Sequence, residues 1–81
     1  MICKRVYLDE NGELNLKPGE YGKHRDGLWY VMPKEDLLAN LGKHNITEHE
    51  DGAITVNPSI LVSNHLGSWH GYLTHGILKE C

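Results

Sequence analysis

The chain has 81 residues, a length that suits a single domain spanning residues 1–81 with a small hydrophobic core. Its net charge is −3 and its eight Lys and Arg residues are scattered, so the sequence offers no basic stripe for a nucleic-acid backbone. No apolar run approaches the roughly 20 residues that a membrane span requires. These features argue against nucleic acid and membrane as partners.

The two cysteines, Cys3 and Cys81, lie at opposite ends of the chain. A secreted domain of this size would carry a denser set of disulfides, and the first residues lack an apolar signal-peptide core. We therefore expect a cytoplasmic protein with reduced thiols. A bridge between the two cysteines stays open as an alternative if the first and last strands pair.

The first half of the chain predicts strands separated by polar turns. Residues 5–8 and 28–32 are the clearest strands, and Lys17-Pro18-Gly19-Glu20 has the composition of a type II turn. Residues 34–41 are the only helical candidate, because Pro33 suits a first helical position and Leu37, Leu38 and Leu41 share one helical face. A segment with 3₁₀ character is the competing interpretation of the same residues.

Residues 48–79 predict an antiparallel meander of short strands. Asp51-Gly52 is the strongest turn signal and indicates a two-residue type I′ hairpin, in which both central residues have positive φ. Pro58 has no N–H to donate, so it belongs at a bend, a bulge or a sheet edge. Trp69 to Leu73 and Ile77 to Lys79 are the last two strands. The sequence as a whole predicts a mostly β fold, a small antiparallel meander or sandwich-like sheet with one short helix or 3₁₀ segment at 34–41.

The segments EDGAITVNPSILV and GSWHGYLTHGILKEC resemble a family of short bacterial and phage proteins catalogued as domain of unknown function 6527. LKPGEY and GLWYVMP are similar to its phage-borne branch, so the resemblance covers most of the chain. It implies a phage or prophage protein built on the same turns and strands. Some relatives carry a Cys-x-x-Cys knuckle that suggests zinc; here Met32 stands at the first of those positions and no Cys follows.

Trp69-His70-Gly71 is the first candidate for a functional site. On a strand, Trp69 and His70 point to opposite faces, and we expect Trp69 to enter the core and His70 to stay exposed. His70 is then placed to hydrogen-bond Ser59 or Ser63 on a neighbouring strand. A Ser–His pair can begin a nucleophilic site, but the sequence contains no nucleophile elbow and no oxyanion loop, which favours a structural role.

Metal binding by histidine is the second candidate. His65, His70 and His75 are spaced by five residues, which places successive side chains on opposite faces of a strand, and Cys81 could join His70 or His75. Zinc sites contain closely spaced ligand pairs, and none is present. We therefore predict no metal site and no cofactor.

An exposed aromatic patch is the third candidate, formed by Trp29 or its neighbour Tyr30 with Tyr72 or Tyr21. The alternative is that both residues of the Trp29–Tyr30 pair are buried. The favoured function is a non-enzymatic binding or regulatory module of phage or prophage type that acts through a protein surface, with a host system as one target. A small zinc protein or degenerate enzyme and an oligomeric structural protein are the alternatives, and a homo-oligomer would protect the edges of a thin sheet. Binding residues are predicted at His70, Ser59, Trp29 and Tyr72.

Overall fold

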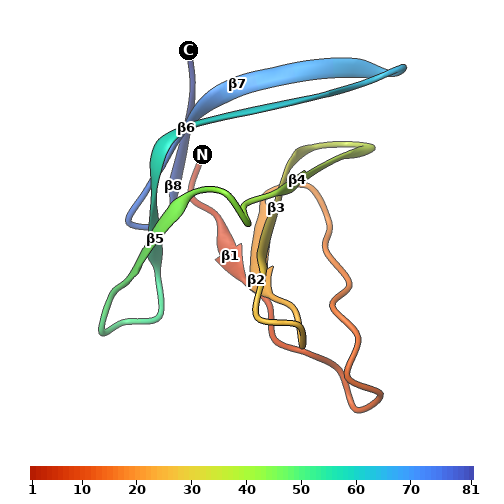
Figure 1. Cartoon of the computed structure of the whole chain (residues 1–81), viewed down its shortest axis with the longest axis vertical. Helices are drawn as coiled ribbons and strands as arrows, with labels where there is room; N and C mark the ends of the chain where they lie inside the picture. Colours follow the sequence, from red (N-terminus) through yellow and green to blue (C-terminus); the bar gives the residue numbers. More distant parts are fainter.

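Eight β-strands and no helix make up the computed structural model, which describes residues 1–81 (Figure 1). The strands are β1 (Lys4–Arg5), β2 (Glu20–Lys23), β3 (Trp29–Lys34), β4 (Leu37–Asn40), β5 (Asn45–Glu48), β6 (Ile54–Asn64), β7 (Gly67–Thr74) and β8 (Ile77–Glu80). They form two four-stranded sheets, with strand orders β1-β2-β3-β4 and β5-β6-β7-β8. The prediction of a mostly β fold is confirmed.

Every strand pair except one is antiparallel, the exception being the short parallel pair β1 and β2. The second sheet is the predicted meander, since each strand pairs with the next one in the chain. Alternation explains why these residues form strands: in β7, Trp69, Gly71 and Leu73 are buried while the residues between them are exposed. One face of the sheet therefore enters the core and the other meets solvent.

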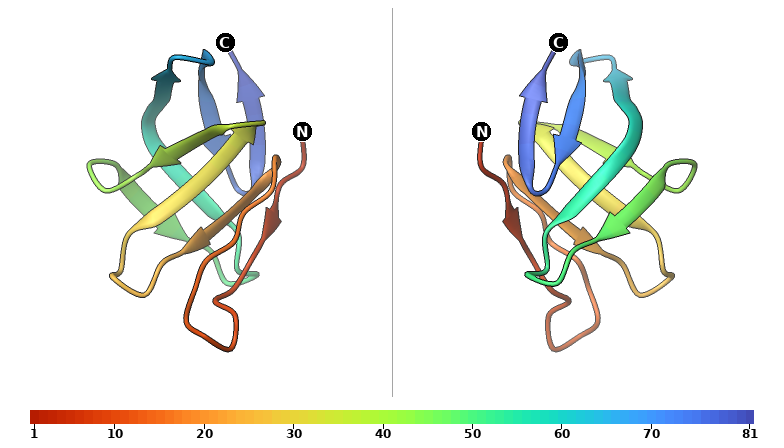
Figure 2. Two further views of the ribbon diagram at one scale, coloured as in Figure 1. Left: turned by 90° about the vertical axis from the view of Figure 1, so that its right-hand side faces the viewer. Right: turned by 90° about the vertical axis from the view of Figure 1, so that its left-hand side faces the viewer.

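The first six residues join the two sheets. Ile2 is bridged to Ile77 in β8, and the Cys3 N–H donates to the Gly76 carbonyl at 2.8 Å. From the next residue on, the partner changes: the Lys4 N–H donates to the Gly19 carbonyl at 3.0 Å, and the Val6 N–H donates to the Tyr21 carbonyl of β2 at 2.8 Å. Backbone hydrogen bonds thus run from one sheet into the other through this segment, and the two sheets curve around a shared interior (Figure 2). On the opposite side β4 packs against β6 without strand pairing.

The core contains residues from both sheets. It is formed by Cys3, Tyr21, Trp29, Val31, Leu37, Ala39, Leu41, Ile54, Val56, Ile60, Trp69, Leu73 and Leu78. Both tryptophans are in this set, so the prediction that Trp69 faces inward is confirmed. Because the chain has no Phe, the two indoles and the aliphatic side chains supply most of the apolar volume.

The predicted helix or 3₁₀ segment at 34–41 is wrong, because this stretch is the β3–β4 hairpin. Lys34 pairs with Leu37, and Asp36 in the turn between them has φ of 61°. Leu37, Ala39 and Leu41 are buried while Leu38 is 50% exposed, which is the period of a strand. Over so few residues the leucine spacing fits both the period of a helix and the period of a strand. A helix of two turns would also have gained little stability by itself.

The turn at Asp51-Gly52 also differs from the prediction. Gly52 has φ of 89°, but Asp51 does not have positive φ, and the bonds His49 N–H to Ala53 O and Gly52 N–H to His49 O close a three-residue loop. The Asp51 carboxylate explains this, since it accepts the Ala53 N–H at 3.0 Å and holds the turn itself. Two consecutive residues with positive φ occur instead at His75 and Gly76, between β7 and β8.

Pro58 lies within β6, which is a single long strand rather than two short ones. The register with β7 shifts between Val56 and Ile60, so Pro58 occupies a bulge, one of the three positions predicted for it. Cys3 is buried and Cys81 is exposed, and both are free thiols. The first strand, β1, does not pair with β8. An isolated antiparallel bridge joins Ile2 to Ile77, and the two segments run from it in opposite directions, which carries Cys3 and Cys81 apart.

Candidate functional site

The outward face of the β5–β8 sheet contains three of the four residues that the sequence singles out for binding: Ser59, His70 and Tyr72. His70 Nε2 lies 3.0 Å from Ser59 Oγ, so the expected cross-strand contact is formed, with Ser59 rather than Ser63 as the partner. The Ser59 carbonyl also accepts a hydrogen bond from His44 Nε2 at 3.1 Å. Ser59 follows Pro58 in the β6 bulge, and these two contacts hold the bulge against β7 and against the segment that precedes β5.

The Ser59–His70 pair has the first two members of a nucleophilic site and none of the others. The only side-chain hydrogen bond of His70 is the one to Ser59, and no carboxylate orients its ring. His70 is exposed, so solvent competes for its ring nitrogens. The arrangement suits a hydrogen bond that braces the bulge.

A diagonal row of exposed apolar side chains crosses the same face. Leu61 is opposite His70, Tyr72 is the next outward residue of β7, and Ile77 lies on β8 beyond it. The cross-strand register places Tyr72 at a diagonal position to both Leu61 and Ile77, a separation that large side chains span. Ile77 in turn is opposite Ile2. The exposed fractions are 72% for Leu61, 51% for Tyr72, 51% for Ile77 and 86% for Ile2. We call these four residues the apolar stripe.

Trp29 does not join this surface. It is 7% exposed and lies in β3 of the other sheet, where the Arg5 guanidinium stacks 4.9 Å from the centre of its ring. Arg5 also stacks on Tyr7 and forms an ion pair with Glu48 at 2.7 Å. The hydrogen bond from Arg5 lowers the pKa of the Glu48 carboxyl. Trp29 therefore belongs to a contact that ties the first sheet to β5.

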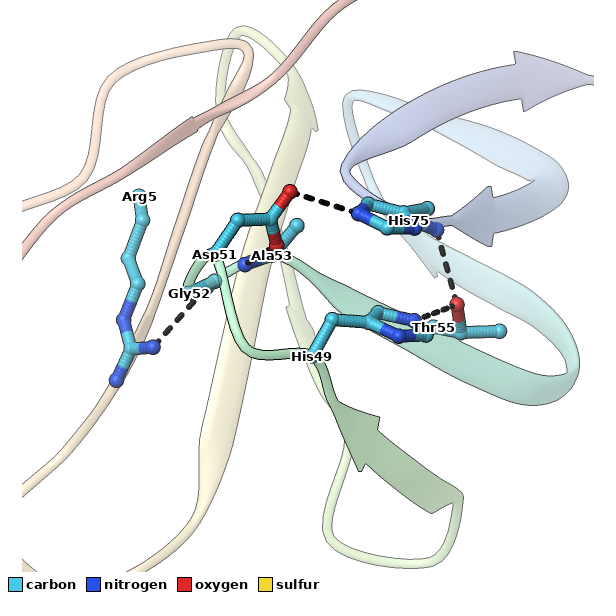
Figure 3. A network of polar contacts seen from close by, with 7 residues as sticks. All are labelled: Arg5, His49, Asp51, Gly52, Ala53, Thr55 and His75. Atoms are coloured by element: carbon cyan, nitrogen blue, oxygen red, sulfur yellow. Dashed lines mark hydrogen bonds and ion pairs between the residues drawn. The ribbon is translucent and has the colours of Figure 1, made fainter.

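Sequence reasoning missed a cluster of polar side chains at one end of the second sheet, formed by His49, Asp51, Thr55 and His75 (Figure 3). The imidazole rings of His49 and His75 are stacked, with centres 4.1 Å apart and planes 2° from parallel. His49 Nε2 lies 2.7 Å from Thr55 Oγ1, and the His75 backbone N–H donates to the same oxygen at 2.9 Å. His75 Nε2 lies 2.8 Å from Asp51 Oδ2.

Hydrogen-bond donors and acceptors in this cluster can be assigned from its charges. The hydrogen bond with His75 is the main cause that lowers the pKa of the Asp51 carboxyl, and the Ala53 N–H adds to it. The Asp51 carboxylate is thus ionised at neutral pH and can only accept hydrogen bonds. The hydrogen of the bond between the two side chains is therefore carried by His75 Nε2, which donates it to Asp51 Oδ2. The sequence spacing of 26 residues between the two histidines carried no signal for this contact, because it depends on how two turns meet in space.

Neither His70 nor the stacked pair of His49 and His75 is arranged to hold a metal ion. No set of three or more His, Cys, Asp or Glu side chains lies close enough together to do so. In the His49–His75 pair the rings are parallel, and a metal must lie near the plane of each ring that binds it. Their lone pairs therefore do not converge on one point.

A shallow groove of about 420 Å³ lies on the outer side of the first sheet. It is lined by Leu14, Asn15, Leu16, His24, Tyr30, Met32 and Leu38. The ring of His24 meets Tyr30 edge to face, and its Nδ1 is 3.2 Å from the Asp26 carboxylate. Tyr30, one of the aromatic residues that the sequence singles out, lines this groove, whereas its neighbour Trp29 is buried.

The fold and these surfaces define a small all-β protein of two linked four-stranded sheets with an apolar stripe on one outward face. The chain matches no protein-family model, no curated protein and no solved structure. Its strands are the only regular elements, and the structure has no helix that could cross a membrane.

Proposed function

We propose that this protein is a non-enzymatic binding module that recognises another protein through the apolar stripe of Ile2, Leu61, Tyr72 and Ile77. The observation that carries the proposal is the alignment of these four exposed side chains across adjacent strands, from β6 to the first residues of the chain. Exposed apolar groups that gather on one face are typical of protein-interaction surfaces, whereas single exposed ones are common everywhere. Tyrosine is also enriched in such surfaces.

The charges beside the stripe indicate the chemistry of the partner. Lys79 is directly opposite Tyr72 on the outward face, and exposed Lys4 is two residues beyond Ile2. The other outward residues of β7 are Ser68, His70 and Thr74, none of them acidic. A partner with an apolar centre and a rim of Asp and Glu would complement this surface. The Ser59–His70 contact braces the stripe from one side.

The phage or prophage origin and a host protein as the target are part of this proposal, and they are supported by the resemblance to the domain of unknown function 6527 family alone. A cytoplasmic location is supported by the free thiols of Cys3 and Cys81. A self-associating structural protein is the competing proposal, and the same surface would then bind a second copy.

Affinity capture from a lysate of the native host tests the proposal with three proteins: the parent, Tyr72→Ser and Leu66→Ser. Leu66 is a matched control, since it is 62% exposed but lies in the loop between β6 and β7, outside the stripe. We expect a partner that the parent and Leu66→Ser retain and Tyr72→Ser loses. Equal retention by all three proteins would overturn the assignment of the stripe. A dimer of the parent in light scattering that Tyr72→Ser converts to a monomer would favour self-association.

A further inference from the structure

The end of the molecule that contains the stacked histidines is where three segments of the chain meet. His49 and Asp51 belong to the turn before β6, His75 belongs to the turn before β8, and Thr55 at the start of β6 contacts both histidines (Figure 3). The first residues of the chain join them, because the Cys3 N–H donates to Gly76 at 2.8 Å. The Gly76 N–H in turn donates to the Ile54 carbonyl at 2.9 Å.

We propose that His49, Asp51, Thr55 and His75 form an acid-sensitive clasp, which is closed while at most one of the two rings is charged and opens when both are charged. One proton on the pair is well accommodated, because the ionised Asp51 carboxylate lies 2.8 Å from His75 Nε2. A second proton, on His49, places two positive charges in parallel rings whose centres are 4.1 Å apart. Histidine is the side chain whose charge ordinarily changes between pH 5 and 8.

Asp51 is the one carboxylate that hydrogen-bonds to either ring. Glu50 lies exposed in the same turn and makes no side-chain hydrogen bond, and Glu48 is engaged by Arg5 at 2.7 Å. Arg5 also donates to the Gly52 carbonyl at 3.0 Å, which adds a positive charge to this turn. The hydroxyl groups of Tyr7 and Tyr21 face Gly52 and Gly76.

Double protonation also changes the hydrogen bond between His49 and Thr55. The Thr55 hydroxyl oxygen accepts the His75 backbone N–H, and its own hydrogen can be donated to a neutral His49 Nε2 at 2.7 Å. A charged His49 carries a hydrogen on both ring nitrogens and can only donate, so the direction of this bond reverses and the Thr55 hydroxyl loses its acceptor. Repulsion between the two charged rings therefore acts on a turn at His75–Gly76 that also binds the backbone of Cys3.

The readout that follows is the accessibility of the Cys3 thiol. Cys3 is 8% exposed and burial raises the pKa of its thiol, so it reacts slowly while the clasp is closed. Loss of the Cys3–Gly76 hydrogen bond would release the segment that buries it. Cys81 is exposed at all times and is removed from the assay by Cys81→Ser.

The experiment follows the reaction of Cys81→Ser protein with 4,4′-dithiodipyridine at pH 7.5 and pH 5.0. The Cys3 sulfur attacks the reagent, a protein–pyridine mixed disulfide forms, and one thiopyridone leaves and is measured by absorbance. Each rate is divided by that of N-acetylcysteine at the same pH, which removes the intrinsic pH dependence of the chemistry. We expect the normalised rate to rise about tenfold or more on acidification.

Two variants in the Cys81→Ser background separate the clasp from general acid effects. His49→Gln keeps a group that can bond to Thr55 but cannot gain a charge, so the rise should disappear. His65→Gln removes a histidine from the exposed loop between β6 and β7, where it makes no side-chain hydrogen bond, so the rise should persist. A rise of equal size in His49→Gln, or an unchanged rate in the parent, would overturn the proposal. So would loss of the near-ultraviolet circular dichroism of the buried tryptophans at pH 5.0, because that would indicate global unfolding.

Discussion

At the scale of single residues, the closest packing in the core involves Trp69 and Gly71. These residues are two apart in β7 and face the same side, so the indole lies over the glycine. A Cβ atom added at Gly71 would come within 2.5 Å of Trp69 Cη2 and would also clash with the Lys79 carbonyl. Gly71 is thus required by close approach of two neighbours and not by an unusual φ angle.

We predict that Gly71→Ala lowers the free energy of unfolding by about 1–3 kcal/mol, the usual cost of overpacking a filled core. The indole of Trp69 or strand β8 has to move to admit one methyl group. Urea unfolding followed by tryptophan fluorescence measures the change. Ser68→Ala, on the exposed face of the same strand, is the matched control and should stay within about 0.5 kcal/mol of the parent. Equal stabilities for the two variants would contradict this packing.

At the scale of elements, the β3–β4 hairpin is where local preference and tertiary packing disagree. Pro33, two acidic residues and three leucines favour a helix, yet the chain reverses at Glu35–Asp36 and continues as a strand. Burial decides between the two structures: Leu37 and Leu41 are each 1% exposed in the strand arrangement. The Asn64 side chain also donates to the Asp36 carbonyl at 2.7 Å and anchors the turn to the end of β6.

Replacement of each turn residue by glycine distinguishes the hairpin from a helix. Asp36 has φ of 61°, a conformation that costs a residue with a side chain roughly 1–2 kcal/mol and costs glycine nothing. Glycine also loses more backbone entropy on folding than other residues, which lowers the free energy of unfolding by about 0.5–1 kcal/mol. We therefore predict that Asp36→Gly raises the free energy of unfolding by up to about 1 kcal/mol and that Glu35→Gly lowers it. Thermal or urea unfolding would measure both, and a helix would be destabilised by either change.

Local pattern located most of the strands, failed for residues 34–41 and for the type of the Asp51–Gly52 turn, and was a poor guide to contacts between distant segments. The alternation around Trp69 predicts which residues face inward, and the lack of an N–H in Pro58 predicts a bend, a bulge or an edge, of which the structure has the bulge. The Ser59–His70 contact follows from the same alternation. The joining of the sheets by residues 1–6 and the stacking of His49 on His75 depend on how far-apart strands meet, and no periodicity reports that. Trp29 is hidden by Arg5, which no local pattern around Trp29 indicates.

At the scale of the whole molecule, several surface carboxylates make stability depend on pH in acid. The pKa values of Asp26, Glu48 and Asp51 are all lowered, chiefly by hydrogen bonds from the Leu28 N–H, from Arg5 and from His75, respectively. A carboxyl whose pKa is lower in the folded state binds its proton more readily in the unfolded state. Its contribution to stability is therefore complete above the unfolded pKa, near 4, and is lost as pH falls through the folded pKa.

The corresponding prediction concerns the loss of stability between pH 4.5 and pH 2.5, measured by urea unfolding. The parent should lose stability over this range, and Asp26→Asn should lose less because it no longer gains a proton there. Glu35→Gln changes an exposed carboxylate outside these hydrogen bonds, so it should follow the parent closely. A slope for Asp26→Asn parallel to that of the parent would contradict the role assigned to the Leu28 hydrogen bond. Asp26 lies outside the clasp, so opening of the clasp does not enter this comparison.

The link between the sheets also constrains the order in which the protein can form. Ile2 finds its partner at Ile77, and Cys3 at Gly76, so nearly the whole chain must be synthesised before the first residues can pair. Until then Ile2 and Cys3 lack their backbone partners, and the first sheet lacks this link to the second. Contacts between such distant residues must overcome a large loss of chain entropy, which is typical of β proteins that fold in milliseconds to seconds. We therefore infer that closure of the two sheets is a late step of folding, and that the first residues stay unpaired until the turn between β7 and β8 has formed.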